Sequence, residues 1–89
     1  MRLSRTASYE RAEKKFFKKH RDLLPRYADV LKKLAKDPFD PALKTHKLKG
    51  ELAEYHACSL TYEFRIVLTI KVTEDEIILM AIGSHDEVY

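Results

Sequence analysis

Three histidines, one arginine and a terminal tyrosine are the side chains of this sequence best suited to move protons and to neutralise a phosphate. His46, His56 and His85 fall near or within expected strands, and imidazole exchanges protons near neutral pH. Arg65 can bind a phosphate through two parallel hydrogen bonds, and Tyr89 can stack on a base or transfer a proton. RNA phosphodiester cleavage needs a base for the 2′-hydroxyl, cations for the phosphorane and an acid for the leaving oxygen. These five residues could supply those groups.

Each of these residues also has a plainer interpretation. A single histidine on a strand can be structural or simply exposed to solvent. Arg65 can form a surface ion pair with Glu63, Glu54 or Asp86. The stretch at 82–89, IGSHDEVY, can be a mobile chain end.

Metal and thiol chemistry have weaker support in the sequence. His56 and Cys58 put two potential metal ligands on one strand face, but no second cysteine or close histidine pair completes a zinc site. Nothing organises a Cys–His nucleophilic pair, and no glycine-rich phosphate loop is present. We therefore expect no metal and no cofactor. The single cysteine excludes an intramolecular disulfide and suits a reducing compartment.

Two amphipathic helices are predicted after a short opening strand at residues 2–7. Apolar side chains recur at three- and four-residue spacing over residues 8–20 and 24–36, and Ser8 can cap the first helix. Pro25 suits the first turn of the second helix, which ends before a proline-containing segment. The short connection predicts an antiparallel helical hairpin.

The rest of the chain changes to the two-residue period of strands, predicted at residues 52–59, 64–71 and 76–82. The order is β-α-α-β-β-β in a single domain over residues 1–89. The fold class is α+β, with an N-terminal strand and a helical hairpin packed on an antiparallel sheet. A chain of 89 residues has a modest core, which argues against large cofactors and two-domain clefts.

Alternation within the strands assigns side chains to faces. Even-numbered residues from Phe64 to Ile70 suit packing under the helices, so Arg65 lies on the opposite face. In the preceding strand His56 and Cys58 share a face. If the polar faces of the two strands coincide, His56 and Arg65 point into one concave surface.

Charge is distributed unevenly along the chain. Residues 1–50 hold 15 of the 17 Lys and Arg side chains and 6 of the 14 acidic ones, a balance of +9, whereas residues 51–89 come to −6. A basic half can bind a polyanion, although a lysine-rich helix can also be only a solvated face. No apolar run is long enough to cross a membrane, and no signal peptide is visible, so we expect a cytoplasmic protein.

Three motifs that follow the helical hairpin resemble the RelE/ParE superfamily of type II toxins, and most closely its YafQ branch. They are HKLKG at 46–50, YEFRIV at 62–67 and IGSHDEVY at 82–89. The resemblance implies a RelE-like domain and a ribosome-dependent mRNA interferase, an endoribonuclease that cleaves mRNA by metal-independent attack of the 2′-hydroxyl on the adjacent phosphate. It also implies a cognate antitoxin, with which the toxin forms a hetero-oligomer that binds operator DNA through the antitoxin.

The resemblance also implies which residues form the site. His46 and His85 match active-site histidines of YafQ, Tyr89 matches the terminal aromatic residue, and Arg65 matches the arginine of a Tyr-Arg-Leu motif in RelE-like relatives. These four are expected to be catalytic. The residues expected to bind substrate stand at or beside the remaining motif positions: His56, Glu63, Phe64, Lys47 and Lys49.

The sequence departs from the family at three site positions. Ala57 and Ser59 stand where YafQ has an acid and a histidine, and Ala81 stands where it has an arginine. Arg65, Lys47 and protonated histidines would then have to neutralise the scissile phosphate. Two other functions stay open: a ParE-like toxin that inhibits DNA gyrase by binding, and a degenerate toxin that only binds its antitoxin.

Overall fold

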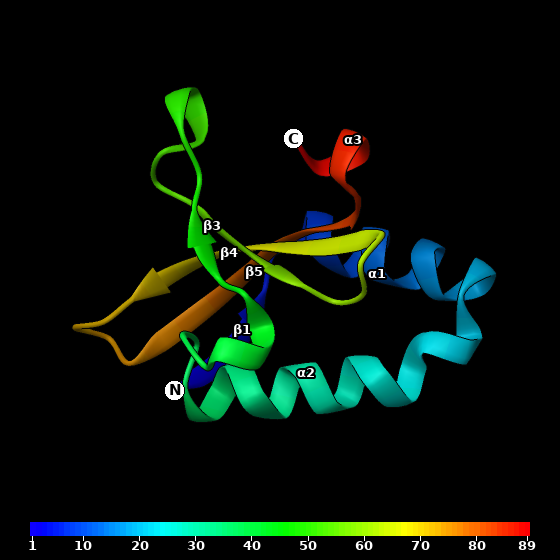
Figure 1. The fold of residues 1–89 in the computed structure, drawn as a ribbon, viewed down its shortest axis with the longest axis horizontal. Coiled ribbons are helices and arrows are strands. Elements are labelled where there is room, and N and C mark those ends of the chain that lie inside the picture. Colours follow the sequence, from blue (N-terminus) through cyan, green and yellow to red (C-terminus); the bar gives the residue numbers. More distant parts are fainter.

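A five-stranded sheet with the order β1-β5-β4-β3-β2 forms the centre of the molecule (Figure 1). The computed structural model describes all residues from 1 to 89. The strands are β1 (Arg2–Arg5), β2 (His46–Lys47), β3 (His56–Ser59), β4 (Phe64–Lys71) and β5 (Glu76–Ser84). β1 pairs in parallel with β5 and the other pairs are antiparallel, so the sheet is mixed.

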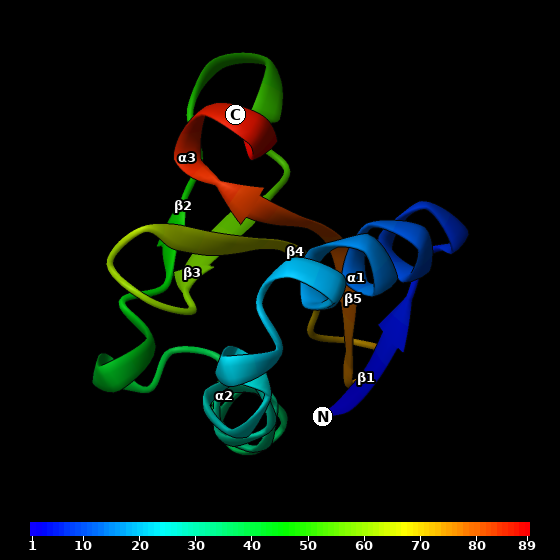
Figure 2. The same cartoon turned by 90° about the vertical axis from the view of Figure 1, so that its right-hand side faces the viewer.

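Two helices, α1 (Ala7–Lys19) and α2 (Leu24–Lys36), cover one side of this sheet (Figures 1 and 2). A short 3₁₀ turn, η1 (Arg21–Leu23), joins them, and the α+β class with an N-terminal strand and two helices is confirmed. The predicted cap is wrong by two residues: Thr6, not Ser8, precedes α1, and its Oγ1 accepts a hydrogen bond from the backbone N–H of Tyr9 at 3.0 Å. No helix combines the length and apolar character that a membrane span requires.

The predicted strand at residues 52–59 is only half formed. Its first part belongs to the 3₁₀ turn η3 (Gly50–Leu52) and a following turn, where the N–H of Ala53 donates to Gly50 O and that of Tyr55 to Leu52 O. These local bonds occupy backbone donors that a strand would offer to its neighbour. Besides η3, neither β2 at the sheet edge nor α3 (His85–Val88) after β5 was predicted.

The main core lies between β4, β5 and the two long helices. Ile66 and Leu68 of β4 are fully buried there, which confirms the predicted face assignment of that strand. In β5 the alternation is broken: Leu68 pairs with Leu79 and Val67 pairs with Ala81, so Met80 is an extra residue that forms a β-bulge. Because of the bulge, β5 directs apolar residues toward the helices both before and after Met80.

A second, smaller apolar cluster covers the opposite face of the sheet. It contains Ala57 and Val67, and Val88 of α3 packs against it. Close packing of α3 depends on Gly83, because a Cβ there would lie 3.1 Å from Glu87 Oε1 and 3.4 Å from Val88 Cγ1.

The chain end at residues 82–89 is therefore ordered by strand pairing and by a capped helix turn. Ser84 accepts from the Glu87 N–H at 3.3 Å, and the Glu87 carboxylate accepts from the Ser84 N–H at 2.9 Å. This reciprocal capping box also lowers the pKa of Glu87, because its carboxylate accepts the Ser84 hydrogen bond. The interpretation of this stretch as a mobile end is not supported.

The prediction that His56 and Arg65 share a concave surface is wrong. His56 pairs with Leu68, whose side chain points toward the helices, and its ring lies 5.6 Å from that of Phe39. Arg65 is on the same face as Val67, on the other side of the sheet. The polar residues of β3 and β4 suggested that the polar faces of the two strands coincide. The register between the strands instead places His56 and Arg65 on opposite faces of the sheet.

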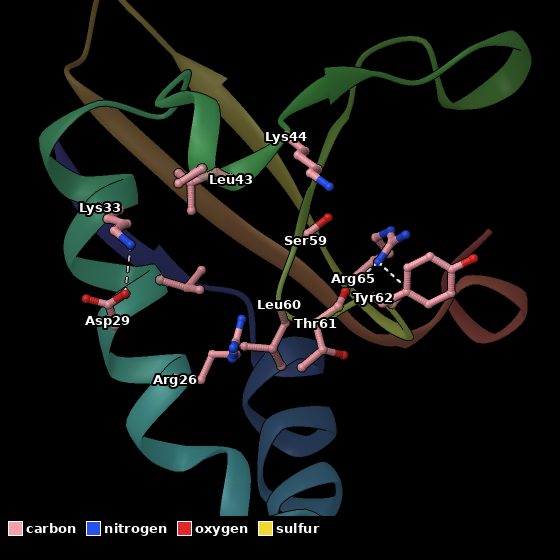
Figure 3. Close-up of a pocket in the computed structure, with 12 residues that line it drawn as sticks. Arg26, Asp29, Lys33, Leu43, Lys44, Ser59, Leu60, Thr61, Tyr62 and Arg65 are labelled. Atoms are coloured by element: carbon pink, nitrogen blue, oxygen red, sulfur yellow. Dashed lines mark hydrogen bonds and ion pairs between the residues drawn. The ribbon is translucent and has the colours of Figure 1, made fainter.

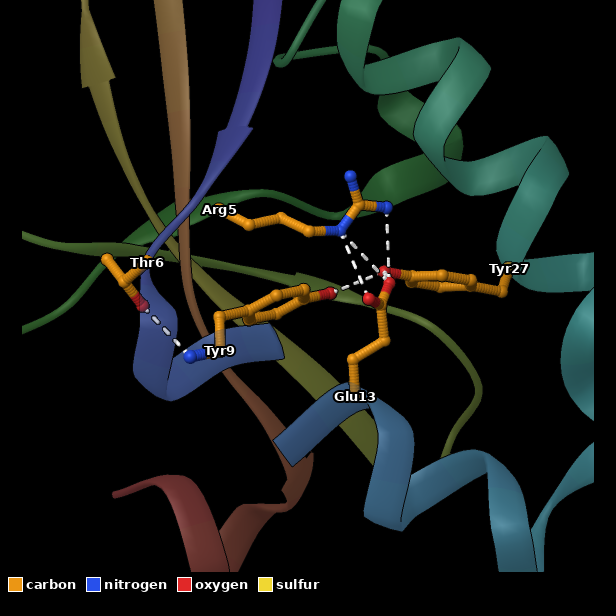
Figure 4. Close-up of polar contacts among 5 residues, drawn as sticks. All are labelled: Arg5, Thr6, Tyr9, Glu13 and Tyr27. Carbon is orange, nitrogen blue, oxygen red and sulfur yellow. Dashed lines mark hydrogen bonds and ion pairs between the residues drawn. The ribbon is translucent and has the colours of Figure 1, made fainter. Parts of the chain in front are cut away.

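A polar network joins β1, α1 and α2 (Figure 4). Arg5 donates from Nε and Nη2 to the two carboxylate oxygens of Glu13, each at 3.1 Å. The Tyr27 hydroxyl also donates to Glu13, and the Tyr9 and Tyr27 hydroxyl oxygens lie 2.8 Å apart. Burial, together with the hydrogen bond to Glu13, raises the pKa of Tyr27 to about 12. The network satisfies the polar atoms of two tyrosines that the helices bury.

We expect Tyr27→Phe to lower the free energy of unfolding by about 1–3 kcal/mol, because it leaves the buried Tyr9 hydroxyl without its partner. Urea unfolding followed by circular dichroism measures the change. Tyr62→Phe deletes the same atom from a side chain that is 97% exposed and should change the stability by no more than about 0.5 kcal/mol. Equal effects of the two substitutions would contradict a stabilising role for the network.

We also expect His56 to make stability depend on pH. Burial, with smaller contributions from Lys47 and His46, lowers the pKa of His56, and its Nδ1 is buried without a hydrogen-bond partner. The unfolded state therefore binds more protons below about pH 6.5, so stability falls as the pH drops through that range. His56→Phe should reduce the slope of unfolding free energy against pH between about pH 7 and 5. An unchanged slope would contradict this assignment.

Candidate active site

Arg65 is held in place by the turn that precedes its own strand. Its Nη1 donates to the carbonyl oxygens of Thr61 at 2.7 Å, Tyr62 at 2.8 Å and Phe64 at 3.2 Å. Neither Nε nor Nη2 has a hydrogen-bond partner within the chain. The guanidinium is thus oriented by one nitrogen and keeps donors free for an anionic ligand.

α3 brings His85 and Tyr89 together. Their rings are in edge-to-face contact, with centroids 4.3 Å apart and an interplanar angle of 76°. The exposed His85 Nδ1 lies 3.7 Å from Asp86 Oδ1. Burial raises the pKa of Tyr89, and the positive charge of Arg65 partly opposes this shift. Arg65 pairs with Gly83, two residues before His85, so the chain end at residues 85–89 starts beside Arg65.

The register shows that these residues share one side of the sheet with His46. His46 pairs with Ala57, and Ala57 and Val67 both belong to the apolar cluster beneath α3. Figures 1 and 2 show the η3 segment and α3 rising on this same side. No hydrogen bond or ring contact joins His46 to His85 or Tyr89; its Nδ1 lies 3.2 Å from Lys44 O. The structure thus groups Arg65, His85 and Tyr89, with His46 apart on the edge strand.

Several residues predicted to bind substrate lie elsewhere. Phe64 is partly buried against the main core on the helical side, and its ring centroid lies 4.9 Å from that of Phe16 and 4.7 Å from that of His20. Lys47 pairs with His56 and so shares its side of the sheet, opposite Arg65. The remaining two, Lys49 and Glu63, are exposed at the margins of the strands.

Cys58 is unsuited to nucleophilic chemistry here. It is fully buried in the main core, and burial raises the pKa of its thiol to about 12, so it stays protonated. No group of three or more His, Cys, Asp or Glu side chains is arranged to hold a metal ion.

Two residues beside Arg65 were not singled out from the sequence. Tyr62 is 97% exposed on the turn whose carbonyls bind Arg65. Lys44 ends the short 3₁₀ turn η2 (Pro41–Leu43) with a left-handed backbone, φ 52°. The signal for Tyr62 was its place in YEFRIV, outside the apolar alternation that begins at residue 64.

Comparisons with known proteins agree with this architecture. The family model described as the bacterial toxin of type II toxin-antitoxin system, YafQ, matches residues 1–89. A metal-bound toxin from Helicobacter pylori is 29% identical with a TM-score of 0.84, and the alignment covers 100% of this chain and 99% of that chain. No curated protein matches the chain in sequence.

Two more distant toxins share the fold. YafQ from E. coli strain BL21(DE3) superposes with a TM-score of 0.83 at 13% identity, over 100% of this chain and 99% of that chain. A YoeB/ParE toxin from Agrobacterium tumefaciens gives 0.81 at 21% identity, over 96% and 99%. The family match over the whole sequence shows that the chain belongs to the YafQ family of toxins of type II toxin-antitoxin systems.

Proposed function

We propose that this toxin is a ribosome-dependent endoribonuclease that cleaves mRNA. The observation that carries the proposal is the pairing of Arg65, which has free Nε and Nη2 donors, with Gly83, from which the chain continues into α3 with His85 and then to Tyr89. A fixed cation, an exposed imidazole and an aromatic hydroxyl match the needs of phosphodiester cleavage.

In the proposed reaction a base removes the proton of a ribose 2′-hydroxyl, whose oxygen attacks the adjacent phosphorus. The bond to the 5′-oxygen then breaks, an acid protonates that oxygen, and the products end in a 2′,3′-cyclic phosphate and a 5′-hydroxyl. His85 acts as acid or base with His46 as its partner across the face, while Arg65 neutralises the phosphorane. Tyr89 stacks on a base beside the cleaved bond.

The ribosome supplies the positioning that the toxin lacks. Ala57 and Ala81 add no charge to this face, and His46 does not contact α3, so a free RNA would rarely adopt the reactive geometry. Contacts between the basic helices and ribosomal RNA would hold the toxin there. The lysines proposed for those contacts are exposed along α1: Lys14, Lys15, Lys18 and Lys19.

A cognate antitoxin is the proposed protein partner. E. coli YafQ has been crystallised with DinJ as a toxin-antitoxin complex, and that toxin shares the fold of this chain at 16% identity with a TM-score of 0.80. By extension, the antitoxin of this toxin inactivates it within a hetero-oligomer that binds operator DNA through the antitoxin. The acidic second half of the chain, with a balance of −6, would then face basic segments of that partner.

His85→Ala should abolish growth arrest after induction and lower the rate of ribosome-bound mRNA cleavage by about 10²–10⁴-fold, the usual contribution of a general acid or base. Primer extension on mRNA bound to purified ribosomes measures the cleavage. Asp86→Ala removes an exposed neighbour on the same helix turn and should leave cleavage within about threefold of wild type.

If His85→Ala arrests growth as strongly as wild type, nuclease chemistry is not the cause of toxicity. Inhibition of DNA gyrase by both proteins would then identify the toxin as a ParE-like binder. Absence of growth arrest and of mRNA cleavage by wild type would instead identify a degenerate toxin.

Gly83→Ala tests whether the seating of α3 matters for the reaction. The added Cβ would lie 3.1 Å from Glu87 Oε1 and 3.4 Å from Val88 Cγ1, so these side chains must move by about a few tenths of an ångström, and cleavage should fall by about tenfold. Gly50→Ala is the control: it has open space but φ +68°, so it should lower stability by about 1 kcal/mol and leave cleavage unchanged. Wild-type cleavage by Gly83→Ala would show that α3 does not position the reacting groups.

A further inference from the structure

The largest hollow of the molecule lies beside the candidate active site, on the far side of Arg65. It has a volume of about 630 Å³, is open to solvent, and is lined by α2, the end of η2 and the turn between β3 and β4 (Figure 3). This volume is in the range of sites that hold a nucleotide-sized ligand. None of the reactions proposed above uses it, apart from Arg65, which lines both regions.

Uncompensated positive charge distinguishes this hollow. Arg26, Lys44 and Arg65 line it without an ion-pair partner, whereas Lys33 is neutralised by Asp29, with Nζ and Oδ2 2.9 Å apart. Figure 3 shows Lys44 and Arg26 approaching the turn from opposite sides, Lys44 from η2 and Arg26 from α2. An anionic ligand in this space would meet three cations.

The backbone at Lys44 supports a role for its side chain. Lys44 has φ 52° and ψ 37°, a left-handed conformation that glycine or asparagine adopts at lower cost. The sequence nevertheless places a lysine there, and Figure 3 shows its ammonium directed toward Ser59 and Arg65. A left-handed residue is common at the end of a helical turn and also occurs at ligand-binding positions, so the direction of the Lys44 side chain carries the argument.

An aromatic platform stands at the rim of the hollow. Tyr62 is 97% exposed although it is a large apolar ring, and its own carbonyl oxygen holds Arg65 Nη1 at 2.8 Å. A nucleobase stacked on Tyr62 would place its phosphate near Arg65. Exposed aromatic rings beside cations are the arrangement by which proteins bind single-stranded nucleic acid.

We propose that this hollow binds the segment of single-stranded RNA next to the cleaved bond, with a phosphate on Arg26 and Lys44 and a base on Tyr62. The inference rests on the proposed nuclease function and extends it, because Arg65 connects the hollow with the reacting phosphate. An acidic peptide would satisfy the cations but would gain nothing specific from the tyrosine, so RNA fits the site better.

Fluorescence anisotropy with a labelled single-stranded RNA of about eight nucleotides, at low salt and without ribosomes, tests the inference on the full chain. Tyr62→Ser should weaken binding about tenfold through lost stacking, whereas Tyr62→Phe, which keeps the ring, should bind like wild type. Arg26→Gln should weaken binding and reduce the slope of log affinity against log salt by about 0.7. Lys32→Gln is the matched control on α2, because Lys32 carries the same charge outside the hollow.

If Tyr62→Ser and Arg26→Gln both bind the RNA with wild-type affinity, the inference is overturned. So would a loss confined to Arg26→Gln, since an anion or acidic peptide would then be the better ligand. Cleavage distinguishes the failure of this inference from that of the nuclease proposal. If Tyr62→Ser and Arg26→Gln bind RNA like wild type while His85→Ala loses cleavage, only the proposal that RNA binds in the hollow is refuted. If the variants show the expected loss of RNA binding but the wild-type protein does not cleave mRNA on ribosomes, the nuclease proposal is refuted.

Discussion

The antiparallel pairing of β4 with β5 is the interaction on which the rest of the structure depends. It divides the sheet into a face buried under two helices and a face that carries Arg65 and α3. The bulge at Met80 lets β5 point apolar residues at the helices on both sides of the irregularity, with Leu79 before it and Ile82 after it. A strictly alternating β5 would have turned one of its two halves away from the main core.

The two faces are stabilised by different means. The helical face combines a large apolar cluster with the network around Glu13, whose carboxylate is shared by Arg5 of β1 and Tyr27 of α2. The other face has a cluster of only three buried residues and a helix of four residues held by a capping box. That face buries little apolar surface and leaves its charged and aromatic groups accessible, as the proposed binding of RNA would require.

Long periodic elements could be predicted from the sequence, whereas short ones could not. Both long helices and β4 with its faces were predicted because their patterns extend over many residues. The short elements β2, η3 and α3 were missed since two to four residues show no period. The placement of His56 was wrong because cross-strand register is a non-local property. The hollow beside Arg65 could not be predicted either, since α2, η2 and the β3–β4 turn meet only in the folded chain.

The place of β5 in the sheet also limits when the fold can form. The strand nearest the start of the sequence, β1, pairs with β5, which begins only at Glu76, and β5 also separates β1 from β4. A nascent chain that lacks β5 therefore has neither its central ladder nor the helix turn that carries His85. Such long-range pairing makes folding slow and late. During translation the site would thus be assembled only after almost all of residues 1–89 had been synthesised, which delays the appearance of any harmful activity.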